Sequence, residues 1–226
     1  MCFPAIRKIG ILSLPLLGMG VFILGYLLAA SRYPGGSWAF PGQDGFSWRH
    51  NYLCDLLDTR AVNGAVNTGR YWARGALVAL CSALLLLWYH LPRLTGGAAL
   101  SRRLMRVFGM AALGTTFFLS AGTHDLTVYI AGGLGTGAIA LAIFGLWKGR
   151  RHFLAALGAW CFLIFLLNYV IYESGSFLRA LPLIQKVTFS SFLIWLAGIN
   201  LALLGLNGPK RGEGAKTPGS PEIVTP

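Results

Sequence analysis

Acidic residues are scarce in this chain. Only seven of its 226 residues are Asp or Glu, and charged residues of both signs make up 12% of the sequence. Soluble domains carry about 25% charged residues. Because 55% of the residues are hydrophobic, these deficits exclude an ordinary water-soluble domain and predict a protein that resides in a membrane.

Common catalytic and metal-binding motifs are also missing. The four cysteines form no Cys-x-x-Cys pair, so neither a zinc knuckle nor a dithiol redox pair is supported. The motifs His-Glu-x-x-His and Gly-x-Ser-x-Gly do not occur. His50 and His124 fall on one side of the predicted membrane and His90 and His152 on the other, which excludes a three-histidine site on one side. We therefore predict no cofactor.

Six apolar stretches are what the chain has instead. Each is about 18–22 residues, the length at which an α-helix crosses the hydrocarbon core. They cover residues 9–30, 71–91, 104–121, 127–147, 153–172 and 187–206. The sequence predicts an all-α membrane protein, a six-transmembrane-helix bundle over residues 1–206 with a structured first extracytoplasmic loop. Residues 207–226, rich in Gly, Pro and charge, are predicted to be a disordered cytoplasmic tail.

The basic residues are distributed unevenly between the two sides of this bundle. With a cytoplasmic N-terminus, the inner segments hold 12 of the 19 Lys and Arg residues and only two acids. This positive-inside pattern predicts a multi-pass protein of the cell membrane with both termini in the cytoplasm. The basic clusters are expected to contact anionic headgroups, so membrane lipids are the predicted partners. Nucleic acid is not, because no compact basic domain remains to bind it.

Most of the acids gather on the outer side with several amides and a histidine. Residues 47–58 have helical periodicity and are predicted to form an amphipathic helix at the outer interface. Together with the short outer connections they predict a polar pocket that binds a lipid headgroup or a small ligand. Its candidate ligand-binding residues are Asn51, Asp55, Asp58, His124, Asp125, Glu173 and Lys186. In this hypothesis the aspartates engage a cation or polar headgroup, and Lys186 neutralises Glu173 or binds phosphate.

Three other interpretations remain open. The acids can serve only as helix caps and as partners for nearby Lys and Arg residues. Alternatively, the protein is a membrane-embedded lipid hydrolase in which His124 is the base and Asp125 or Asp55 orients it or holds a metal. A small transporter is the third interpretation, although no charged residue falls near the middle of a predicted span.

The predicted fourth span has an unusual concentration of small residues. Residues 131–137 read Ala-Gly-Gly-Leu-Gly-Thr-Gly, but they follow no strand and lack the Lys-Ser/Thr of a phosphate-binding loop. The pairs Ala131/Gly135 and Gly133/Gly137 instead match the small-xxx-small pattern of closely packed membrane helices. This helix is therefore a candidate surface for a homo-oligomer.

Two segments carry a family resemblance. The first reads Asn-Tyr-Leu-Cys-Asp-Leu-Leu-Asp-Thr-Arg over residues 51–60, followed by Asn63-Gly64 and Asn67; the second reads Pro-Leu-Ile-Gln-Lys over residues 182–186. The chain thereby resembles an uncharacterised bacterial multi-pass membrane family, catalogued as domain of unknown function 998. Cys54 and Leu57 stand where that family has Ser and Gly. The resemblance implies a multi-pass protein of the bacterial inner membrane and no known activity.

Overall fold

The computed structural model describes residues 3–117 and 124–207 of the chain. The α-helices in this part are α1 (Phe3–Ser31), α2 (Arg70–His90), α3 (Ala99–Thr116), α4 (His124–Lys148), α5 (His152–Ser174) and α6 (Leu181–Asn207). Two short 3₁₀ helices are η1 (Cys54–Leu57) and η2 (Leu91–Arg93). The described residues form no strand, only two isolated bridges in the first loop. The predicted all-α class is confirmed.

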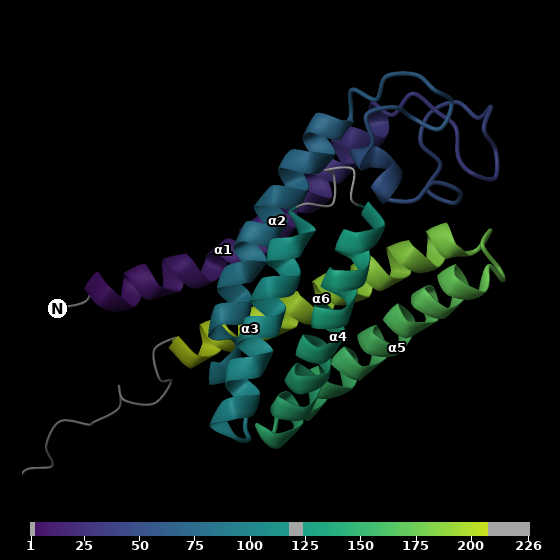
Figure 1. The fold of residues 1–226 in the computed structure, drawn as a ribbon. Coiled ribbons are helices and arrows are strands. Elements are labelled where there is room, and N and C mark those ends of the chain that lie inside the picture. The colour runs from purple at the N-terminus through teal and green to yellow at the C-terminus, as the bar shows by residue number, and fades with distance from the viewer. Residues whose placement is uncertain (1–2, 118–123, 208–226) are drawn as a thin grey trace, which may run out of the picture.

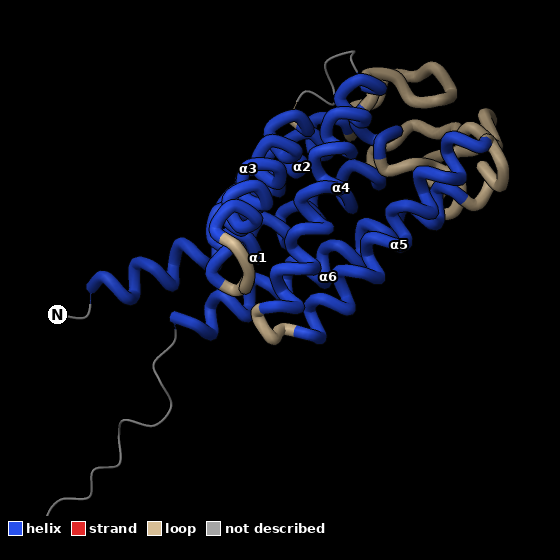
Figure 2. The backbone as a smooth tube through the Cα atoms, turned by 60° about the horizontal axis from the view of Figure 1, so that its bottom comes forward, coloured by secondary structure: helices blue, strands red, loops and turns tan. Residues whose placement is uncertain are grey.

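The helices pack in chain order around a closed ring. Each contacts the next, and α6 returns to contact α1 (Figure 1). The connections gather at the two ends of the bundle (Figure 2). We call the end with residues 32–69 and 175–180 the loop end. The end with the α2–α3 and α4–α5 connections, residues 91–98 and 149–151, is called the basic end.

Five of the six helices are long and apolar enough to cross a membrane: α1, α2, α4, α5 and α6. Their outward side chains include the exposed Leu17, Leu24, Leu163 and Leu201, as expected for surfaces covered by lipid. The predicted span 104–121 corresponds to α3, which does not qualify. Arg102, Arg103 and Arg106 lower the apolar character of its first half, and residues 118–121 lie outside the described part. The predicted tail lies outside it from residue 208 onwards.

Glycines of α1 allow this helix to approach α2 closely. A Cβ added at Gly18 would overlap the Ala83 Cβ of α2, and one at Gly25 would lie 2.5 Å from the Ala76 Cβ. Gly18 and Gly25 are seven residues apart and so lie on the same side of α1. The absence of side chains at these two positions therefore sets the distance between α1 and α2.

The glycines of α4 contribute less packing than the sequence pattern suggests. Gly137 lies beneath the Phe108 ring of α3, and Gly135 is in contact range of Ala112. A Cβ added at Gly132 or at Gly133 would have no neighbouring atom within 4 Å. Only one half of the small-residue segment thus packs within the chain, and the predicted homo-oligomer through α4 stays a prediction.

A buried amide joins the last helix to the first. The Asn200 side chain of α6 is fully buried and donates a hydrogen bond from Nδ2 to the carbonyl of Leu12, at 2.9 Å. This bond lies one turn from Pro15, which has no N–H and interrupts the hydrogen-bond ladder of α1. Polar contacts between membrane helices are worth about 1 kcal/mol, so this bond helps to close the ring.

Candidate functional site

The first loop is held by side-chain hydrogen bonds and has little regular structure. The amphipathic helix predicted over residues 47–58 is wrong, because only η1, Cys54–Leu57, is helical within that segment. The physical reason is that Asn and Asp side chains readily form hydrogen bonds with nearby backbone groups, and these bonds compete with the backbone hydrogen bonds of a helix. The Asn51 Oδ1 accepts the Ser47 N–H, and the Asp55 Oδ2 accepts the Tyr52 N–H, each at 2.9 Å.

Asn51 is the centre of this loop. Its side chain is fully buried. The Nδ2 donates to the Gly36 carbonyl at 2.7 Å and to the Asp55 Oδ2 at 2.8 Å. The Oδ1 accepts from the Gln43 Nε2 at 2.8 Å as well as from Ser47. Four bonds use the full capacity of a primary amide, so the Asn51 side chain has no remaining group to offer a ligand.

Asp55 lies beside Asn51 with its carboxylate turned inwards. Burial raises the pKa of this carboxyl above its usual range, while the hydrogen bonds from Asn51 and Tyr52 and the charge of Lys186 act in the opposite direction. Burial also raises the pKa of the neighbouring Cys54 thiol to about 11. Cys54 is therefore protonated at neutral pH and is a poor nucleophile and metal ligand.

Two residues of α6 fasten the loop to the bundle. The Lys186 Nζ donates to the Asn51 carbonyl at 2.5 Å and to the Pro182 carbonyl at 2.9 Å. The Gln185 Oε1 accepts the Leu53 N–H at 2.9 Å. We call these contacts of Gln185 and Lys186 with the loop backbone the latch. The sequence predicted a last helix that starts at residue 187, whereas α6 begins at Leu181. Gln185 and Lys186 therefore lie in the second turn of this helix.

The last part of the loop is held by Asn67, which belongs to the loop itself, and by Arg74 of α2. Asn67 is fully buried, and its Nδ2 donates to the carbonyls of Leu56 and Asp58 at 3.2 and 3.0 Å. The Arg74 Nε donates to the Leu57 carbonyl at 2.9 Å. The carbonyls at the end of a helix have no partner within it, so these two side chains supply the bonds that η1 lacks.

The structure brings some of the predicted site residues together and separates others. Asn51, Asp55 and Lys186 form one connected network. Asp58 follows η1 with an exposed side chain. Glu173, near the end of α5, accepts a hydrogen bond from the Tyr129 hydroxyl at 3.1 Å.

His124 and Asp125 open α4, but their side chains lie outside the described part of the structure. The sequence-based site also omitted Gln43, for which the sequence gives no signal. It omitted Gln185 as well, although that residue is adjacent to Lys186 in the segment that carries the family resemblance.

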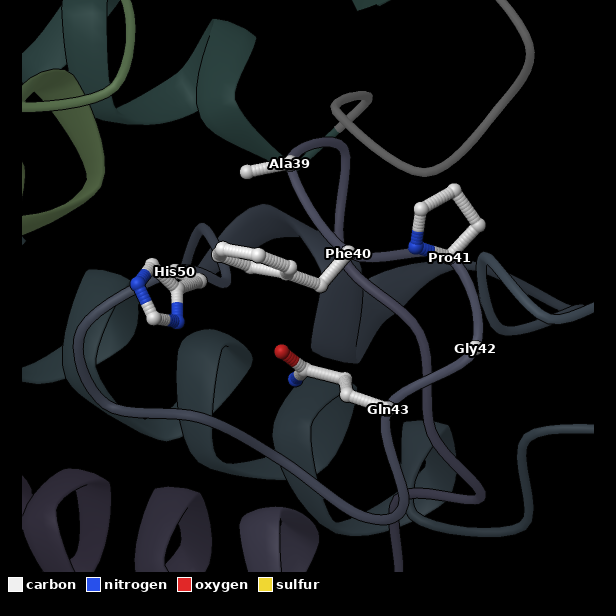
Figure 3. A pocket seen from close by; sticks show the side chains of 6 residues that line it. All are labelled: Ala39, Phe40, Pro41, Gly42, Gln43 and His50. Carbon is white, nitrogen blue, oxygen red and sulfur yellow. The ribbon is translucent and has the colours of Figure 1, made fainter.

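An open depression of about 540 Å³ lies on the outer surface of the loop. Figure 3 shows the Phe40 and His50 rings next to each other, with the Gln43 amide below them. The two rings meet edge to face, with centroids 4.6 Å apart. The depression is lined by Ala39, Phe40, Pro41, Gly42, Gln43 and His50. None of the seven predicted ligand-binding residues belongs to this lining.

The part of the chain that the structure describes holds no cluster of metal-ligand side chains. There, no group of three or more His, Cys, Asp and Glu side chains is close enough to hold an ion. Comparisons with protein-family models, with curated proteins and with solved structures found no match to this chain. Its function is therefore argued from the geometry of the loop and the bundle alone.

Proposed function

We propose that the protein is a non-enzymatic integral membrane protein that binds a phospholipid headgroup at the loop end. The proposed contact surface is the depression beside Phe40 and His50. The observation that carries the proposal is that this depression opens outwards from a loop whose backbone is fixed from inside by Asn51 and the latch. A surface held in one conformation loses little entropy when it binds a ligand.

The residues that line the depression, and those next to them in the sequence, suit the boundary between lipid and water. Trp38, Phe40 and Trp48 are all about half exposed. Trp is enriched where a membrane protein meets the headgroups. Arg49, which is exposed, and His50 supply hydrogen-bond donors for a phosphate. These features support a headgroup as the ligand, whereas the buried Asn51 network serves to hold the loop in place.

The proposal includes six spans, with α3 as the third. α3 packs along α4, where Phe108 covers Gly137. Its 18 residues are about 27 Å long at 1.5 Å per residue, close to the hydrocarbon thickness. We also propose that the basic end faces the cytoplasm of a bacterial cell, because Lys and Arg favour that side. Both termini are then cytoplasmic.

The family resemblance gains support from the latch. Its two segments, residues 51–60 and 182–186, are about 130 positions apart. They meet through the hydrogen bonds from Lys186 to Asn51 and from Leu53 to Gln185. Membership of the family catalogued as domain of unknown function 998 is therefore part of the proposal, and it adds an architecture without adding an activity.

Native mass spectrometry of the protein in mild detergent tests the headgroup site. We expect His50→Ala together with Phe40→Ala to retain one phospholipid fewer per chain than wild-type protein. The matched control is Phe177→Ala together with Arg179→Ala, which removes an exposed Phe and an exposed cation from the α5–α6 connection, outside the lining of the depression. Equal retention by both double variants would refute the headgroup site.

Two measurements separate the alternative functions: the metal content seen in native mass spectrometry, and transport assayed in liposomes. A stoichiometric zinc that is lost in His124→Ala would support the lipid hydrolase. Solute flux through the protein in liposomes would support the transporter. Neither result is expected if the protein only binds lipid.

A further inference from the structure

The basic end carries a high density of positive charge. Within the described residues its two connections and the adjoining helix turns hold seven Lys and Arg residues and no Asp or Glu. The seven are Arg93, Arg102, Arg103, Arg106, Lys148, Arg150 and Arg151. Like charges gathered in this way repel one another, and an anionic ligand would relieve that repulsion.

Close backbone packing brings the two connections together. The Gly96 N–H donates to the Gly145 carbonyl at 2.8 Å. A Cβ at Gly96 would lie 2.8 Å from the carbonyl carbon of Lys148, and one at Gly149 would overlap the carbonyl oxygen of Leu94. Because two glycines allow this approach, the charges of the α2–α3 and α4–α5 connections share one surface.

Beside this surface, two nitrogen atoms are buried without a partner. The Arg106 guanidinium lies over the Tyr89 ring, 4.8 Å from its centroid, and the Tyr89 and His90 ring centroids are 5.0 Å apart. The Arg106 Nε and the His90 Nδ1 are both buried and make no hydrogen bond. Leaving a buried polar atom unpaired is unfavourable. The Arg106 Nε–H, and the His90 Nδ1 in the form that carries a proton, would therefore each gain from a hydrogen bond to an acceptor.

We propose that Arg106, His90 and Arg93 form a binding site for the phosphate of an anionic phospholipid. Arg binds phosphate through parallel N–H···O bonds, which a single point charge does not match. Arg93 is exposed one 3₁₀ turn after His90 and extends the positive surface beyond the pair. This site lies at the opposite end of the bundle from the depression and does not depend on it.

The surroundings of the site favour a lipid over other polyanions. Large apolar side chains are exposed next to the cations: Leu100 and Val107 on α3, Trp147 on α4 and Phe153 on α5. Phe153 is 77% exposed. A phospholipid presents a phosphate and acyl chains together, so it matches both the charges and these apolar groups. A nucleic acid matches the charges alone.

The test is native mass spectrometry in mild detergent with added phosphatidylglycerol or phosphatidylcholine of identical acyl chains. We expect wild-type protein to bind one phosphatidylglycerol in preference to phosphatidylcholine. Arg106→Gln should weaken that binding about tenfold, because it removes a charge-assisted contact. Arg106→Lys should give an intermediate affinity. The matched control is Arg179→Gln, an exposed arginine at the loop end.

Three outcomes would overturn the proposal: equal binding of both lipids by wild-type protein, an equal loss in Arg179→Gln, or displacement of the lipid by single-stranded DNA. If Arg106→Gln does not fold, Arg93→Gln replaces it, since that side chain is exposed and its loss leaves no cavity. The double variant His50→Ala with Phe40→Ala should lose only the loop-end lipid, so the basic end should still bind phosphatidylglycerol in preference to phosphatidylcholine. Failure of the loop-end proposal and failure of this one are therefore distinguishable.

Discussion

At the scale of single residues, buried amides determine the conformation of the first loop. Asn51 and Asn67 are both fully buried, and each bonds to backbone groups that have no partner in a helix or strand. An unpaired buried backbone group costs about 1–3 kcal/mol. A loop of this kind therefore depends on a few side chains far more than a helix of equal length does.

Asp55 should give the loop a measurable pH dependence. Its pKa is raised by burial, so the folded state holds the proton more tightly than the unfolded state. The stability from this group is then fully present below about pH 4, the unfolded pKa, and is lost as the pH rises through the folded pKa. Asp55→Asn keeps an oxygen that can accept the bonds from Asn51 and Tyr52, but it cannot titrate.

We therefore expect the stability of wild-type protein relative to Asp55→Asn to fall as the pH rises from about 4, the unfolded pKa, through the raised pKa of the folded state. Thermal unfolding of both proteins in the same detergent across this range measures the difference. If wild-type protein instead became more stable relative to Asp55→Asn as the pH rises, the attraction of the Lys186 charge would outweigh the effect of burial. A difference that does not change would mean that Asp55 ionises equally well in both states.

At the scale of helices, glycine positions determine which pairs approach closely. Gly18 of α1 faces Ala83 of α2, while Gly20 of the same helix has no neighbouring atom within 4 Å. Two residues on one helix thus provide a matched pair for mutation. The same contrast occurs in α4, where Gly137 packs against α3 and Gly133 does not.

Gly18→Val should destabilise the protein by about 1–3 kcal/mol, the usual effect of overpacking a close contact. The added Cβ would overlap Ala83, and neither helix has a flexible side chain there to move aside. Gly20→Val, the control, should change stability little. Thermal unfolding in detergent compares the two. Equal destabilisation would show that loss of glycine itself, and not the α1–α2 contact, is responsible.

Helices were easier to predict from the sequence than the loop was. Apolar length alone located α1, α2, α4, α5 and α6, because a helix that crosses lipid needs a continuous apolar run. Residues 47–58 also have helical periodicity, but the side chains of Asn51 and Asp55 bond to the local backbone and displace the helix.

The latch could not be predicted because it joins residues more than 130 positions apart. Asn51, Asp55 and Lys186 were chosen from the sequence as neighbours, and they are neighbours. What the sequence did not reveal is that Asn51 is fully bonded within the protein. A list of polar residues does not distinguish groups that face a ligand from groups that hold a loop.

At the scale of the whole molecule, the number of helices that cross the membrane determines which connections lie on the same side of it. If α3 crosses the membrane, the first loop and the α5–α6 connection lie on the same side. If α3 does not cross, these two segments lie on opposite sides, and the hydrogen bonds of the latch could not form. The connection between α2 and α3 lies on the opposite side from the first loop in both arrangements, because only α2 separates them.

Single cysteines at exposed positions distinguish these arrangements. In a background without native cysteines, Thr59→Cys and Ser176→Cys should both react with a membrane-impermeant maleimide added to intact cells. Ala98→Cys, which is exposed at the basic end, should react only after the cells are opened. Reaction of Thr59→Cys without Ser176→Cys would remove α3 from the set of spans. Reaction of Ala98→Cys alone would reverse the proposed orientation.

The latch also has a consequence for the order in which the protein is made. A chain emerges from the ribosome with its N-terminal part first, so residues 51–53 exist long before Gln185 and Lys186 are synthesised. Until α6 arrives, the Asn51 carbonyl and the Leu53 N–H lack their partners in the finished protein. The loop that follows the first helix is thus completed by the last one. A chain stopped before residue 185 would present this loop unfastened, and a protease on that side could recognise it as incomplete.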